Sequence, residues 1–147
     1  MNLEYTLKMM NLMKNNIDMF VFNEAFLNKW KDLQISVLNV VRFTRTHKML
    51  SILTTLELFF NEEPNKSRFL EISISADFEL ENFEYLETDG RIEFPHDFIS
   101  MLLGIMYSTI RGVVLDKPIL SGLVLLPLMD TDKLHREVII TQDEPER

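Results

Sequence analysis

The stretch RFLEISISADFEL, residues 68–80, alternates strictly between apolar and polar side chains. The apolar positions are Leu70, Ile72, Ile74, Ala76, Phe78 and Leu80, and the polar positions are Glu71, Ser73, Ser75, Asp77 and Glu79. Successive side chains of a β-strand point to opposite faces, so this period of two predicts a strand with one buried face and one wet face.

Two further strands are predicted on the N-terminal side of this stretch. Residues 50–60 alternate less strictly, and turn-forming residues at 61–66 connect them to residues 68–80 as a hairpin. Residues 33–44 also alternate and are rich in β-branched side chains. Together the three segments predict an antiparallel meander. Residues 3–22 fit a helical stripe in one part and a strand in another, so their pattern leaves both structures open.

The hydrophobic period changes at Phe94-Pro95-His96-Asp97, where Pro95 and Asp97 suit the first turn of a helix. We predict a long helix from this point that ends before Pro118. Its expected core stripe is Phe98, Met101, Leu102, Ile105, Thr109, Gly112 and Val113. A membrane span needs about 20 mostly apolar residues, and this segment contains polar residues and an arginine, so we interpret it as a buried helix.

The C-terminal quarter has a weaker pattern. Residues 130–140 predict one short helix or strand, and residues 140–147 are expected to form a flexible charged tail. The 147 residues are near the usual size of one domain, and we expect a single domain over residues 1–147.

Composition excludes several classes of function. The net charge of -8 would repel a phosphate backbone, so nucleic acid is not an expected partner. The chain has no cysteine, which excludes disulfides and thiolate chemistry and fits a reducing compartment such as the cytoplasm. We find no secretion signal and expect no membrane insertion.

Motifs of catalysis and cofactor binding are missing from the sequence. There is no phosphate loop, nucleophile elbow or dinucleotide fingerprint, and His47, His96 and His135 lack the spacing of metal ligands. His96 and Asp97 form an acid–base pair on paper, but the first turn of a helix favours such residues without any catalysis. We therefore expect no enzyme activity, no cofactor and no metal.

Two features point towards binding, each with a simpler alternative. The acidic side chains of residues 68–80 suit a basic partner, although a solvated sheet face has the same composition. The chain also has nine methionines. Those in apolar context are Met9, Met10, Met13, Met19, Met101, Met106 and Met129. Methionine fills irregular cores, which is the favoured interpretation, but it also lines surfaces that bind many peptides.

The order of these elements resembles the SecB family of bacterial protein-export chaperones and their SecB-like relatives. The resemblance covers most of the chain. Residues 7–22 look like the family's first strand, residues 69–80 like its acidic strand, and Phe94-Pro95 like the Phe-Pro that opens its long helix. Leu126-Pro127-Leu128-Met129-Asp130 looks like its proline loop, with the last helix beginning at residues 132–134. Residues 75–77 and 109–114 depart from the family pattern, which suggests a divergent relative.

The resemblance implies an α+β fold in which a four-stranded antiparallel sheet carries one long helix and a short C-terminal helix. It also implies assembly into homodimers or homotetramers, and binding of unfolded or partner polypeptides in apolar grooves. The matching groove residues are Phe22, Leu123, Leu125, Leu126 and Met129. Glu71 matches the acidic residue that contacts the export ATPase SecA, and Asp77 and Glu79 lie on the same strand face. The alternative function is an interaction subunit with the same fold that binds one folded partner, since fold does not fix function.

Overall fold

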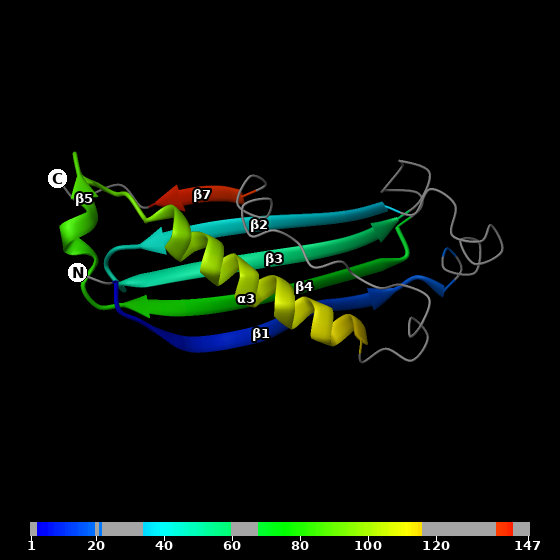
Figure 1. The fold of residues 1–147 in the computed structure, drawn as a ribbon. Coiled ribbons are helices and arrows are strands. Elements are labelled where there is room, and N and C mark those ends of the chain that lie inside the picture. The colour runs from blue at the N-terminus through cyan, green and yellow to red at the C-terminus, as the bar shows by residue number, and fades with distance from the viewer. Residues whose placement is uncertain (1–2, 20, 22–33, 60–67, 116–137, 143–147) are drawn as a thin grey trace.

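The structure is a computed structural model, and it describes residues 3–19, 21, 34–59, 68–115 and 138–142. A twisted sheet forms one layer, and a single long helix crosses one of its faces diagonally (Figure 1). The sheet strands are β1 (Tyr5–Ile17), β2 (Gln34–Thr44), β3 (Met49–Phe59), β4 (Leu70–Leu80) and β7 (Val138–Gln142), and the helix is α3 (His96–Leu115). Between β4 and α3 lie the short helix η1 (Phe83–Leu86) and the two-residue strands β5 (Glu87–Thr88) and β6 (Arg91–Ile92).

The sheet order is β1-β4-β3-β2-β7, and β1 to β4 pair antiparallel throughout. This confirms the predicted α+β fold, with its meander of three strands, a fourth antiparallel strand and one long helix packed on them. The alternation of β4 is also confirmed, because its six apolar positions are all buried. Its acidic side chains lie on the opposite face, where they are only half-buried.

The N-terminal segment, which the pattern left open, forms strand β1. Its register with β4 shifts twice, between Leu7 and Met9 and again between Leu12 and Lys14. The strand ends at Ile17, so the predicted extension to residue 22 is wrong for residues 18, 19 and 21. Asp18 accounts for the end, because its carboxylate oxygen accepts a hydrogen bond from the backbone N–H of Val21 at 3.2 Å.

The sheet has a fifth strand, in a region that the sequence pattern left open as helix or strand. Strand β7 pairs parallel to β2, with Val138 opposite Asn39 and Gln142 opposite Phe43. Residues 138–140 therefore form a strand, the second of the two structures that the pattern left open, and residues 140–142 are not part of a flexible tail. The start of the short C-terminal helix that the resemblance implied, at 132–134, and the rest of the tail at 143–147 lie outside the described residues.

Helix α3 is confirmed, and it packs one side on the inner face of the sheet. Its buried residues are Ile99, Ser100, Leu102, Leu103, Met106, Tyr107, Ile110 and Val114. The predicted core stripe is wrong at Met101, Ile105 and Gly112, which are exposed. By length and composition residues 96–114 would also suit a membrane span, but much of this segment is buried within the fold. Apolar residues surround most of the helix, so sequence pattern gave its period without fixing which side faces the sheet.

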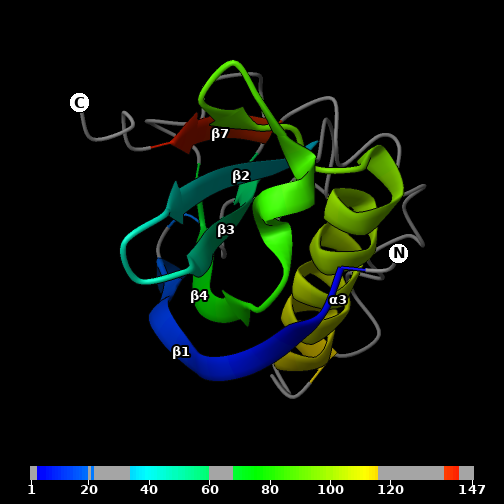
Figure 2. The same ribbon diagram turned by 90° about the vertical axis from the view of Figure 1, so that its left-hand side faces the viewer.

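The hairpin formed by β5 and β6 closes one end of the sheet (Figure 2). Arg45, in the turn between β2 and β3, donates to the Glu87 carboxylate at 3.0 Å and to the Gly90 carbonyl at 3.1 Å. The turn of this hairpin needs left-handed backbone at Asp89 and Gly90, a conformation that glycine adopts without strain. Next to this hairpin, the Phe43 ring packs edge-on against the Phe83 ring of η1, with the two ring centroids 5.1 Å apart.

Candidate polypeptide-binding surface

Strand β1 is an edge strand that exposes large apolar side chains. Its outer edge pairs with no other strand among the described residues. Leu7 and Leu12 are 46% and 51% exposed, although their partners on β4 are the buried residues Phe78 and Ile74. Both leucines therefore belong to the sheet face that carries α3. Sheet edges with unpaired N–H and C=O groups and accessible apolar side chains are sites where proteins add an extended chain.

Helix α3 continues this apolar area with Met101 and Ile105, which are exposed one turn apart. Tyr5 connects the helix to β1: its hydroxyl lies 3.8 Å from the Met101 sulfur, and its ring packs edge-on against Phe98 at 5.5 Å. We call Tyr5, Leu7, Leu12, Met101 and Ile105 together the β1–α3 surface. Large exposed apolar areas on a folded domain mark binding sites more often than scattered single residues do.

The methionines add to the exposed apolar area of β1. The core-filling interpretation favoured from sequence holds for Met106, which is buried, but is wrong for Met9, Met13, Met19 and Met101, which are exposed. Met13 falls at the second register shift of β1 and is 60% exposed. Flexible thioether side chains adapt to differently shaped apolar partners, so their exposure fits the second interpretation, a tolerant peptide-binding surface.

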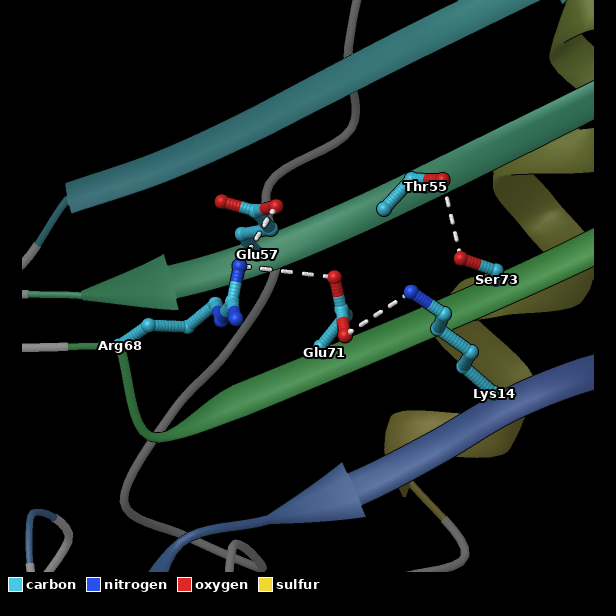
Figure 3. A network of polar contacts seen from close by, with 6 residues as sticks. All are labelled: Lys14, Thr55, Glu57, Arg68, Glu71 and Ser73. Carbon is cyan, nitrogen blue, oxygen red and sulfur yellow. Dashed lines mark hydrogen bonds and ion pairs between the residues drawn. The ribbon is translucent and has the colours of Figure 1, made fainter. Parts of the chain in front are cut away.

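The acidic face of β4 is locally neutralised (Figure 3). Glu71 lies between Lys14 and Arg68, each with a nitrogen 3.5 Å from one of its carboxylate oxygens. Its side chain is only 14% exposed, so a basic partner would have to displace these cations.

Asp77 and Glu79, the other two acidic residues expected to contact a partner, also have partners within the sheet. Asp77 accepts a hydrogen bond from the Ser51 hydroxyl at 2.6 Å, and Glu79 lies 4.0 Å from the Lys8 ammonium group. The strand therefore presents partnered carboxylates to a potential ligand.

The His96 and Asp97 side chains occupy the exposed first turn of α3, as the simpler interpretation predicted. His96 Nε2 lies 3.4 Å from the Ser100 hydroxyl of the next turn. Within the described ranges, no three His, Cys, Asp or Glu side chains gather as metal ligands would.

One recess lies where β1 ends and β4 begins, and its volume is about 150 Å³. Its lining residues are Asn16, Asp18, Arg68, Phe69, Leu70 and Glu71. It is smaller than the roughly 300–1,000 Å³ typical of small-molecule sites.

Comparisons with known proteins give only distant structural likenesses. No protein-family model matches the chain, and no curated protein matches its sequence. A SecB-like chaperone from Mycobacterium tuberculosis, solved with a ChAD peptide of the HigA1 antitoxin, is 12% identical with a TM-score of 0.47. That alignment covers 84% of this chain and 83% of the chaperone. A protein of unknown function from Streptococcus agalactiae is 13% identical with a TM-score of 0.48, over 86% of this chain and 99% of the other.

Sequence reasoning and the structure direct attention to different residues. The expected groove residues Phe22, Leu123, Leu125, Leu126 and Met129 lie outside the described residues. The β1–α3 surface was missed because its helical members were assigned to the core stripe. The apolar residues of the N-terminal segment were the available signal for this surface. Their pattern fitted both a helix and a strand, so it could indicate the surface only once the position of α3 was known.

Proposed function

We propose that this protein binds other polypeptides without catalysis, as a SecB-like chaperone or adaptor of the cytoplasm. The observation that supports the proposal most directly is the 13-residue edge strand β1, whose exposed leucines adjoin exposed apolar residues of α3. An extended segment could pair its backbone with the edge of β1 while its apolar side chains contact the β1–α3 surface. Backbone pairing tolerates many sequences, and the apolar contacts supply affinity.

The expectations that follow from the resemblance complete this proposal. Phe22, Leu123, Leu125, Leu126 and Met129 would extend the apolar groove beyond the β1–α3 surface. SecA is the partner proposed for Glu71, Asp77 and Glu79. Because Glu71 is held by Lys14 and Arg68, such a partner would bring basic groups that exchange with these two cations.

The experiment is a client-aggregation assay with paired leucine variants. A reduced, unfolded test protein is allowed to aggregate with increasing amounts of this protein, and we expect suppression at near-stoichiometric ratio. Leu7→Ser with Leu12→Ser should weaken client binding by roughly 30-fold, since burying each half-exposed leucine contributes about 1 kcal/mol, or about 2 kcal/mol for the pair.

The matched control is Leu38→Ser with Leu53→Ser. These leucines are 45% and 39% exposed on β2 and β3, on the sheet face opposite α3. The control should retain wild-type suppression. Equal loss in both double variants, or no suppression by the wild type, would contradict the proposal.

The second candidate function is that of an interaction subunit, with this same fold but no chaperone activity, which binds one folded partner. The half-buried, fully partnered acidic face of β4 favours it, because a preformed polar surface suits a partner of fixed shape. A pull-down that recovers one folded protein in stoichiometric amount, with no affinity for unfolded chains, would select this function.

A further inference from the structure

The outer edge of β2 lies apart from the β1–α3 surface. It lies at the other edge of the antiparallel strands, where β7 is seated. Strand β7 pairs with residues 39–43 and leaves residues 34–38 of β2 without a partner on that edge among the described residues. Among the described residues, β7 thus covers only part of an 11-residue edge.

The β2 side chains that lie in register with β7 and face the core are buried and mostly apolar. Val41 and Asn39 are fully buried and Phe43 nearly so, and each lies in register with β7. Asn39 accepts a hydrogen bond from the Thr54 hydroxyl at 2.6 Å, while its own amide nitrogen has no partner within the part of the chain that the structure describes. Because these side chains already pack within the fold, a chain seated on this edge would bind through the backbone N–H and C=O groups of β2.

The sequence of β7 indicates which residue types can pair with this edge. Residues 138–141 read Val-Ile-Ile-Thr, and all four are β-branched, the side chains that favour strands most. β7 is parallel to β2, whereas the other four strands pair antiparallel. Parallel ladders are slightly less stable per residue, so a short parallel strand is the part of this sheet that exchanges most easily.

A side-chain clamp holds β7 in place. The Gln142 amide accepts a hydrogen bond from the Ile92 N–H at 3.1 Å and donates one to the Ile92 carbonyl at 2.7 Å. One amide thereby satisfies both backbone groups of a buried residue in β6, as a neighbouring strand would. The strength of this clamp sets how readily β7 leaves the edge.

We propose that the β2 edge is a strand-acceptor site, closed by β7, for an extended β-branched segment of another polypeptide that enters parallel to β2. While β7 is attached to the same chain, its effective concentration is of the order of millimolar, which excludes a weaker segment. A partner gains access when β7 is displaced. The site differs from the β1–α3 surface in three respects: it lies at the opposite edge of the sheet, the bound strand runs parallel to its neighbour, and β7 closes it.

The test uses a full-length variant in which β7 can be locked reversibly. Arg42 and Thr141 are in register, and neighbouring strands lie about 4.8 Å apart, within the Cα separation of a disulfide. The chain has no cysteine, so Arg42→Cys with Thr141→Cys introduces its only thiols. The probe is a fluorescent peptide of residues 136–147, with a shuffled peptide of equal composition as its control.

The expected result is that oxidation weakens peptide binding at least tenfold and that reduction of the same sample restores it. Gln142→Ala should bind the peptide at least threefold more tightly than the wild type, because the clamp is lost. Asn15→Ala, which removes an exposed amide from β1, should bind as the wild type does. Melting curves of each sample confirm that the variants are folded.

Equal binding by the oxidised and reduced forms would overturn the strand-acceptor site. So would peptide binding that is no tighter in Gln142→Ala than in the wild type. The client assay with Leu7→Ser and Leu12→Ser reports on the other edge, so failure here leaves the proposed function intact, and the reverse also holds.

Discussion

Tyr107 is the residue of α3 whose ionisation is coupled to folding. Burial raises the pKa of its phenol above the ordinary value of 10.0, and the positive charge of Arg111 lowers it by a smaller amount. Burial disfavours the charged phenolate in the folded state.

The first prediction is a loss of stability in alkaline solution that depends on Tyr107. Below pH 10 the phenol is neutral in both states, so the raised pKa does not change stability there. Above pH 10 the unfolded chain ionises first, and stability falls until the pH passes the folded pKa. Urea unfolding between pH 8 and pH 11.5 should show a free-energy difference between wild type and Tyr107→Phe that decreases through this range. A constant difference would contradict the coupling.

At the same scale, single residues explain what the sequence could not supply. The exposure of Met9, Met13 and Met101 follows from which neighbours cover each side chain, and periodicity does not contain that information. Acidic residues on β4 were predictable, but their cations were not, because Lys14 comes from β1 and meets Glu71 only after the two strands pair.

Among the elements, the contact between β3 and β4 contains a like-charge pair. Glu57 and Glu71 lie directly opposite each other in the ladder, an arrangement that is unfavourable by itself. Arg68 resolves it: one guanidinium nitrogen lies 3.3 Å from the Glu57 carboxylate and 3.5 Å from that of Glu71. The arginine is part-exposed, so solvent screens its contribution.

The second prediction concerns this arginine. Arg68→Ala should destabilise the fold by about 0.5–1 kcal/mol at low salt, because the two carboxylates then face each other without Arg68 between them, although Lys14 still contacts Glu71. The cost should shrink in 1 M salt, where the Debye length falls to about 3 Å. Denaturant unfolding at both salt concentrations measures it, and Arg68→Lys should recover part of the loss. A cost that is independent of salt would indicate packing by the arginine stem instead.

The elements differ in how far sequence determined them. Strands β2, β3 and β4 were predictable because one buried face imposes alternation and short turns join them. The pairing of β7 with β2 was not, because the two strands lie about a hundred residues apart and a parallel pairing leaves no local turn signal. The extent of α3 was predictable from Pro95 and Pro118. Which side of the helix faces the sheet was not predictable.

For the whole molecule, the third prediction is self-association. We expect dimers or tetramers, since the β1–α3 surface would be partly covered by a second copy. Light scattering should give two or four times the monomer mass. Ile105→Glu should shift this distribution towards the monomer, because it places a charge among exposed apolar side chains. Leu53→Glu, at a similarly exposed position on the opposite face, is the control. A monomer at all concentrations would contradict the expectation.

The two register shifts of β1 should limit uncontrolled strand addition at this edge. A long, flat and apolar edge strand can pair with the same strand of further molecules without limit, as in amyloid. Each shift inserts an irregularity that bends the strand and interrupts even hydrogen-bond spacing, leaving residues 9–12 as an unbroken run between the two shifts. Such an edge can still pair with a short peptide segment, yet its irregular spacing opposes the continuous strand addition that builds a fibril.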